Sequence, residues 1–247
     1  MSLTAVVLGS TGAVGTAVVS SLVSNPSWSE IYVVVRKAPS VPHPSPKVKA
    51  IVIPMPSAGC EASELSTLTS TLKPQLPAKS SATFCLLGVG RPSKGTASNL
   101  KHVDVDLSLS LISAAPASHL SLLTAIGAAR DVPEPVASSL SPLPFARAGG
   151  PLYNYCKGAL ESLCLSLPFS TCSFFQPATL IGTPNTPASF AWLAPRLDWM
   201  LPFDYRSSDV GTLAAAMVKD AEAKVNGGGE KDKVIKGEEL HQLYKSV

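Results

Sequence analysis

The sequence predicts an α/β protein, a doubly wound parallel sheet with helices on both faces and a small C-terminal extension. Short apolar segments alternate with segments of helical spacing along the 247 residues, which is the pattern of such a sheet. The first apolar segment breaks into three spaced glycines, as a buried strand does where it turns into a phosphate-binding helix. The length fits one large domain. We therefore expect residues 1–247 to form a single domain.

The first apolar segment, residues 5–8, leads into Gly9, Gly12 and Gly15. Gly9 can adopt backbone angles closed to other residues, and Gly12 has no Cβ to keep a ligand away from the main chain. Gly15 would let the next helix lie close to the strand. Free N–H groups at that helix start, aided by the helix dipole, would bind a pyrophosphate. The residues expected to bind it are Gly9, Ser10, Thr11, Gly12, Ala13, Val14 and Gly15.

These glycines have the spacing G-x-x-G-x-x-G, whereas the common dinucleotide fingerprint is G-x-G-x-x-G. A strand precedes the motif, residues 16–23 have the pattern of a helix, and a second strand follows at a suitable distance. This context favours a dinucleotide site on a Rossmann-type sheet. A glycine-rich turn in another kind of α/β protein is the alternative.

The second strand, residues 31–35, ends in Arg36 and Lys37. At this place an acid accepts hydrogen bonds from the 2′-hydroxyl of NAD, whereas an arginine accommodates the 2′-phosphate of NADP. A guanidinium binds phosphate through charge-assisted and often bidentate hydrogen bonds, and Lys37 adds positive charge. The sequence therefore predicts NADP(H), with NAD(H) less favoured. An ordinary exposed Arg-Lys pair at a strand end is the alternative.

The later elements alternate in the same way. We expect a loop at 38–46, strands at 48–53, 82–87, 120–125 and 173–177, and helices at 61–72, 99–115 and 153–165, followed by a turn at 227–229, a late strand at 234–235 and a short final helix. The fourth strand ends at glycines 88 and 90, and we expect Leu87 and Gly88 to contact the cofactor.

A second informative site is Tyr153-x-x-x-Lys157. Residues four apart share a helix face, and a phenol catalyses proton transfer near neutral pH only if a cation stabilises its phenolate. Lys157 would do this and also hold the nicotinamide ribose. Thr124, at the end of the fifth strand, would orient a substrate carbonyl toward Tyr153. The alternatives are a helix-surface pair and a threonine chosen for its strand preference.

Together these sites resemble the short-chain dehydrogenase/reductase superfamily, and within its atypical branch the Tat-interacting-protein-like oxidoreductases. The resemblance spans residues 4–182 and rests on residues 8–15, 36–37, 84–88, 103–106, 122–128, Tyr153-x-x-x-Lys157-Gly158 and 175–178. It implies a Rossmann fold, NADP binding and a catalytic set of Thr124, Tyr153 and Lys157. Relatives usually carry serine where Thr124 stands. Many also place an acid against adenine where this chain has Ile53-Pro54-Met55.

The expected function is NADPH-dependent reduction of a small-molecule carbonyl, or oxidation of the corresponding alcohol. The alternative is a catalytically weak NADP(H) sensor or scaffold that regulates a partner through the apolar segments 190–193 and 197–203. We expect specificity to lie at about 182–208, on the substrate side, with 91–98 as a second candidate segment. The insertion at 131–150 has no assigned role. A protein partner or a homodimer is possible.

Composition excludes other classes. The net charge is +3 with scattered basic residues, which does not suggest a nucleic-acid surface. No apolar run is long enough to span a membrane. Four histidines and five cysteines show no metal-ligand spacing, so no metal is expected and the thiols should be free. The first strand begins within four residues, which leaves no room for a secretory signal, and we expect a cytoplasmic protein.

Overall fold

The computed structural model describes residues 2–89, 96–136, 150–184 and 186–245. Its centre is a seven-stranded sheet in the order β3-β2-β1-β4-β5-β6-β9, in which every neighbouring pair is parallel. The strands are β1 Leu3–Leu8, β2 Trp28–Val35, β3 Val48–Val52, β4 Ser80–Cys85, β5 Ala117–Leu123, β6 Thr171–Phe175 and β9 Asp232–Ile235. The predicted doubly wound parallel sheet is confirmed.

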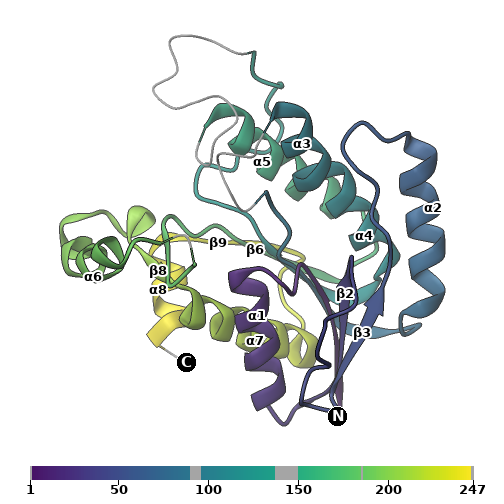
Figure 1. Cartoon of the computed structure of the whole chain (residues 1–247). Helices are drawn as coiled ribbons and strands as arrows, with labels where there is room; N and C mark the ends of the chain where they lie inside the picture. Colours follow the sequence, from purple (N-terminus) through teal and green to yellow (C-terminus); the bar gives the residue numbers. More distant parts are fainter. Residues whose placement is uncertain (1, 90–95, 137–149, 185, 246–247) are drawn as a thin grey trace.

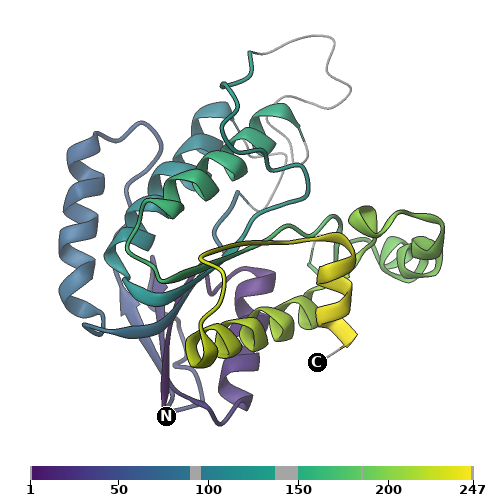
Figure 2. The ribbon, with the colours of Figure 1, turned by 180° about the vertical axis from the view of Figure 1, so that it is seen from behind.

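Helices cover both faces of the sheet (Figures 1 and 2). They are α1 Ala13–Ser24, α2 Ala62–Leu72, α3 Ala97–Lys101, α4 Ser108–Ala114, α5 Pro151–Leu165, α6 Ala188–Leu197, α7 Val210–Gly227 and α8 Gly237–Lys245. One apolar core joins α1 and α7 to one face of the sheet. A second core joins α2, α4 and α5 to the other face. Parallel strands buried on both faces need such continuous apolar sequence.

The strand order reverses between β1 and β4. Consecutive elements run outward from β1 through β2 to β3, and the chain then crosses back to β4 beside β1. In open parallel sheets, ligands bind outside the carboxyl ends of the strands at such a switch point. The Leu86 N–H donates to the Leu8 carbonyl over 2.9 Å, so the two chains leave the sheet side by side. This edge is where the predicted phosphate-binding turn lies.

Two predictions about the elements need correction, and one helix was not predicted. The segment expected as one helix at 99–115 contains a π-helical stretch, η3 His102–Leu107, between α3 and α4. Strands β4, β5 and β6 each end two residues earlier than expected. The predicted late strand exists as β9, and it follows the long helix α7, which the sequence reading missed.

A helical arm stands off the sheet beside the carboxyl ends of the strands (Figure 1). It consists of α6 and two short 3₁₀ turns, η4 Asp198–Met200 and η5 Phe203–Tyr205, and it leaves and rejoins the body through the small sheet of β7 Leu180–Ile181 and β8 Ser208–Asp209. In the described part of the chain no helix is both long enough and apolar enough to cross a membrane. All five cysteines are free thiols.

Candidate functional site

The glycine turn after β1 brings three elements into close contact. Gly9 has φ +88°, and a Cβ there would lie 2.9 Å from the carbonyl carbon of Leu86. A Cβ on Gly15 would lie 2.1 Å from the Gly9 carbonyl oxygen. Both distances are shorter than any van der Waals contact, so these two positions admit only glycine. The turn is therefore built to hold α1 close against the ends of β1 and β4.

Gly12 differs from its two neighbours in the motif. It is the N-cap residue of α1, and no side chain caps this helix. A Cβ on Gly12 would have the Gly9 carbonyl oxygen as its nearest neighbour at 3.5 Å, an ordinary contact. Protein packing thus leaves space at Gly12. Uncapped N–H groups at a helix start attract an anion, and the bare main chain at Gly12 would let a diphosphate approach them.

A groove of about 600 Å³ opens beside this turn. Its lining residues are Gly9, Thr11, Gly12, Val34, Val35, Arg36, Met55, Leu86, Leu87, Gly88, Val89, Asn99, Val103 and Leu107. The glycine turn lines one part of the groove, and the ends of β2 and β4 line another part. Leu87 and Gly88, which the sequence predicts to contact the cofactor, are both in the lining.

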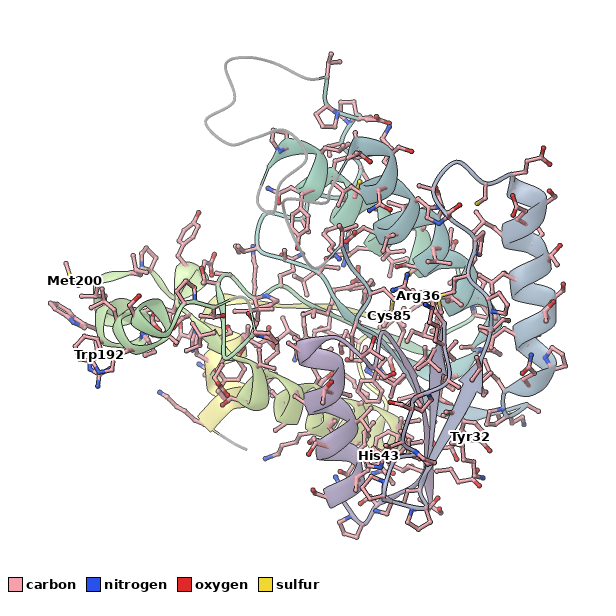
Figure 3. All side chains as sticks on the ribbon, viewed as in Figure 1. Tyr32, Arg36, His43, Cys85, Trp192 and Met200 are labelled. Carbon is pink, nitrogen blue, oxygen red and sulfur yellow. The ribbon has the colours of Figure 1, made fainter. Side chains whose placement is uncertain are left out.

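Arg36 and Lys37 lie at the outer end of the groove. They line a neighbouring hollow of about 560 Å³ together with Thr11 and Met55. Both side chains are exposed, and Figure 3 shows Arg36 at the end of β2. Among the described residues that line the two hollows, none is acidic.

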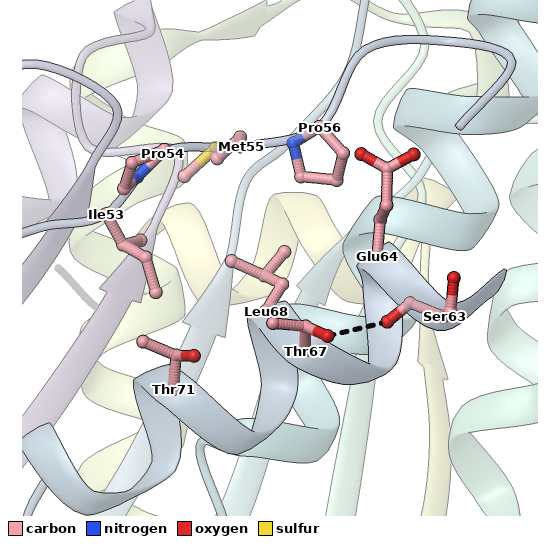
Figure 4. A pocket seen from close by; sticks show the side chains of 9 residues that line it. All are labelled: Ile53, Pro54, Met55, Pro56, Ser63, Glu64, Thr67, Leu68 and Thr71. Atoms are coloured by element: carbon pink, nitrogen blue, oxygen red, sulfur yellow. Dashed lines mark hydrogen bonds between the residues drawn. The ribbon is translucent and has the colours of Figure 1, made fainter. Parts of the chain in front are cut away.

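A third hollow, of about 450 Å³, lies between α2 and the segment that follows β3 (Figure 4). Its apolar side consists of Ile53, Pro54, Met55 and Leu68. Met55 also lines the groove. Met55 therefore gives both hollows an apolar wall, whereas Glu64 lines only the third hollow.

Lys157 extends from α5 to the segment that follows β4, which lines the groove. Its Nζ forms an ion pair with Asp104 Oδ1 at 2.6 Å, and both side chains are buried. The same Nζ donates to the Leu87 carbonyl over 3.3 Å and lies 5.7 Å from the centre of the Tyr153 ring. The structure thus brings Tyr153 and Lys157 together beside Leu87 and Gly88. The sequence indicated no role for Asp104, although residues 103–106, which contain this aspartate, contribute to the family resemblance.

The charges around Tyr153 act in opposite directions. Burial raises the pKa of the Tyr153 phenol, Lys157 lowers it and Asp104 raises it, and the result is a pKa above its usual value. Lys157 thus acts on the Tyr153 pKa in the expected direction, but burial, with a smaller contribution from Asp104, outweighs it. Burial also acts to lower the pKa of Lys157, but Asp104 and Tyr153 outweigh it and keep the lysine charged.

Thr124 is not directed to the same place. It is the first residue after β5, and its buried hydroxyl donates to Glu161 Oε1 over 2.6 Å. Glu161 lies eight residues beyond Tyr153 on α5, about 12 Å along the helix axis at about 1.5 Å per residue. The structure therefore joins the Thr124 hydroxyl to Glu161 instead of bringing it to Tyr153.

Glu161 is the centre of a buried polar network. Its Oε2 pairs with Arg130 Nε at 2.9 Å, and Gln176 Nε2 donates to Oε1 over 2.9 Å. Arg130 also binds Asp232 through both terminal nitrogens. Buried carboxylates are stable only when such partners compensate them. The network therefore ties α5 to the ends of β5, β6 and β9, which is a structural use for Thr124.

The loop after Thr124 has no other hydroxyl to offer, since residues 125–129 are Ala, Ile, Gly, Ala and Ala. It packs against α5, because a Cβ on Gly158 would lie 1.9 Å from the Ala129 carbonyl oxygen. The expected set of Thr124, Tyr153 and Lys157 is thus only partly assembled. The predicted strand-end Gly90, most of segment 91–98 and most of the insertion at 131–150 lie outside the described residues.

Comparisons with known proteins agree on the fold. No protein-family model matches the chain. An oxidoreductase, ylbE, from Lactococcus lactis aligns with 18% identity and a TM-score of 0.58 over 99% of this chain and 96% of its own. A short chain dehydrogenase family protein from Francisella tularensis gives 14% and 0.62 over 98% and 100%. WbmG from Bordetella bronchiseptica, solved with NAD, gives 14% and 0.59 over 99% and 77%. The chain has the Rossmann fold of these enzymes.

Curated relatives are more similar in sequence, and their names state a location. Protein FMP52, mitochondrial, from Lodderomyces elongisporus is 26% identical over 98% of this chain and 97% of its own length. Its namesake from Candida albicans is 27% identical over 98% of both chains. The cytoplasmic location expected from the sequence is contradicted by these mitochondrial relatives. Neither the composition nor the early first strand determines the cellular location of a protein. The expectation of a cytoplasmic location therefore had no physical basis.

Proposed function

We propose that the protein is an NADPH-dependent oxidoreductase that reduces a small carbonyl compound or oxidises the corresponding alcohol. The observation that carries this proposal is one continuous groove. The uncapped helix start at Gly12 and the side chain of Arg36 line this groove, and so do Leu87 and Gly88. The buried Lys157 lies directly behind Leu87 and Gly88, with its ammonium near the Tyr153 ring. Neighbours of the same fold, among them an NAD complex, support a nicotinamide dinucleotide.

NADP(H) is favoured over NAD(H) by the charges at the end of β2. The 2′-phosphate carried by NADP alone would meet Arg36 and Lys37, and a guanidinium forms charge-assisted hydrogen bonds with such a group. No described lining residue there supplies the acid that selects the 2′-hydroxyl of NAD.

The residues of the chain would divide the work as follows. The α1 start binds the diphosphate, and Lys157 holds the ribose next to the reacting ring. Tyr153 donates the proton that the substrate oxygen takes up on reduction. The bound nicotinamide would supply the hydride. Because burial, and to a smaller extent Asp104, outweigh Lys157 and raise the pKa of Tyr153, Tyr153 donates as a neutral phenol. Thr124 takes no part in this scheme, since its hydroxyl is bonded to Glu161.

The test is a carbonyl panel assayed with NADPH. Tyr153→Phe should abolish turnover and leave NADPH affinity nearly unchanged, because the ring remains and only the proton donor is lost. Tyr155→Phe is the matched control on the same helix and should keep its turnover. Unchanged turnover in Tyr153→Phe would refute the mechanism.

A second candidate function rests on the exposed arm. Trp192, Trp199 and Met200 are 60%, 76% and 64% exposed, and Figure 3 shows Trp192 and Met200 at the far end of the arm. Exposed apolar side chains in this number are typical of a contact surface. In this candidate the protein is a sensor or scaffold whose partner binding depends on NADP(H). Partner capture that changes with NADPH, without turnover on any carbonyl, would favour it.

Location is part of the proposal. The names of the curated relatives support a mitochondrial protein. Fractionation of cells that express the untagged chain tests this, and recovery outside the mitochondrial fraction would refute it.

A further inference from the structure

Lys157 is held in an environment that is unusual for a lysine. Its side chain is buried, and its counter-ion Asp104 is fully buried. Asp104 Oδ1 forms an ion pair with Lys157 Nζ at 2.6 Å, and Oδ2 accepts a hydrogen bond from the Val89 N–H over 3.1 Å. The carboxylate therefore bridges the lysine and the segment that follows β4. That segment is the wall of the groove.

The backbone that carries Asp104 is also unusual. Asp104 lies in the π-helical stretch η3, where the sequence predicted a regular helix. The Ser108 hydroxyl donates to the Val103 carbonyl over 2.7 Å and stabilises this wider turn. π-helical turns interrupt α-helices rarely and often at functional sites. This one turns Asp104 toward α5, whereas Asp106 on the same stretch is exposed.

The fit around the pair is tight. A Cβ on Gly88 would lie 3.3 Å from Asp104 Oδ1 and 3.4 Å from Lys157 Nζ. The ion pair is thus packed directly under the main chain of the groove wall. A ribose that reaches Lys157 would meet an ammonium already held in place. This is preorganisation, which lowers the cost of ordering a long side chain on binding.

We propose that Asp104 is a positioning residue: it keeps Lys157 charged and directed at the groove wall before the coenzyme arrives. The purpose of this ion pair rests on the proposed function, whereas the unfolding experiment that tests the pair does not need the coenzyme. A lysine buried without a counter-ion gives up its proton, whereas a compensated one retains it. The groups that face Lys157 are Asp104 from η3, Tyr153 from α5 and Cys85 from β4. Asp104 is the carboxylate among them.

The first experiment needs no coenzyme. Asp104→Asn keeps the shape and removes the charge, and Asp106→Asn is the matched control on the same stretch. Thermal unfolding is followed from pH 6 to pH 10. In Asp104→Asn the folded chain would release the Lys157 proton between about pH 7 and pH 9, while the unfolded chain still binds that proton. Stability of this variant therefore rises with pH.

The expected result is a melting-temperature deficit in Asp104→Asn that is large at pH 6 and at least halved at pH 10. Asp106→Asn should follow the wild type throughout. A deficit that stays constant with pH would overturn the proposal, because a carboxylate that merely bonds the Val89 N–H would give that result. If Asp104→Asn does not fold, the double variant Asp104→Asn/Lys157→Gln decides. It removes both charges and should fold, and failure of the double variant would also overturn the proposal.

A second readout uses NADPH. Asp104→Asn should bind it at least tenfold more weakly at pH 9 than at pH 7, whereas the wild type should change by less than threefold. Equal pH dependence in both would contradict the proposal. Failure of the wild type to bind NADPH would refute the proposed function alone, since the unfolding experiment would still decide the role of Asp104.

Discussion

Replacing Gly12 by alanine should leave the fold intact and remove coenzyme binding. The main chain at Gly12 has φ −75° and ψ 167°, which alanine adopts freely. The added Cβ would have its nearest protein neighbour at 3.5 Å. Stability should therefore change by no more than about 0.5 kcal/mol, or rise by up to about 1 kcal/mol because the unfolded chain loses freedom.

The effect on binding should be far larger. The new methyl group would stand where the diphosphate must approach the start of α1. If the methyl group displaces the diphosphate from two main-chain N–H donors, two hydrogen bonds to a charged group are lost, each worth about 1.5–3 kcal/mol. The smaller total, about 3 kcal/mol, corresponds to roughly a hundredfold weaker binding.

The assay pairs a fluorescence titration of NADPH with thermal unfolding of the same samples. Gly15→Ala is the control for a glycine required by packing. Its Cβ would lie 2.1 Å from the Gly9 carbonyl oxygen, so this variant should lose stability and binding together. A Gly12→Ala variant that binds NADPH as the wild type does would refute the assignment of this turn to the diphosphate.

Two further predictions concern the buried polar groups. Burial lowers the pKa of His119 to about 3. Below about pH 6.5 the unfolded chain therefore binds a proton at His119 that the folded chain does not bind. Unfolding free energy should fall by about 2 kcal/mol between pH 7 and pH 5, less a smaller opposite contribution from Asp220, whose pKa burial raises. Chemical denaturation checks this, and His119→Gln should show a flatter profile; an equal slope in both proteins would contradict the reasoning. Thr124→Val should cost about 1–3 kcal/mol of stability, because buried Glu161 loses a donor, while Thr124→Ser should cost little. If Thr124→Val kept its stability and lost turnover, Thr124 would be the catalytic hydroxyl after all.

Local features of the sequence were enough for most of the fold. The spaced glycines and the apolar runs are signals that residues carry within a few positions of one another. They placed the turn, most strands and the Tyr153–Lys157 face correctly. The helix α7 was missed, although its alanine-rich sequence Leu213–Ala216 suits a helix.

Partners distant in the chain could not be predicted. Asp104 and Lys157 are 53 residues apart, and Thr124 and Glu161 are 37 residues apart. Nothing near Thr124 shows that its hydroxyl will bond a carboxylate on α5. Likewise no local pattern predicts the π-helical turn that directs Asp104 inward. Spacing indicates which residues share a face, but only the packed structure decides what that face meets.

The central claim is that this chain binds a phosphorylated dinucleotide through the Gly12 turn and Arg36. The most direct measurement is a calorimetric titration of NADPH and of NADH into the wild type and Arg36→Ala. We predict that the wild type prefers NADPH by about 10–100-fold, the worth of one charged hydrogen bond of about 1.5–3 kcal/mol. Arg36→Ala should bind both coenzymes at the NADH level. A wild type that binds neither coenzyme, or a preference for NADPH that survives in Arg36→Ala, would contradict the account.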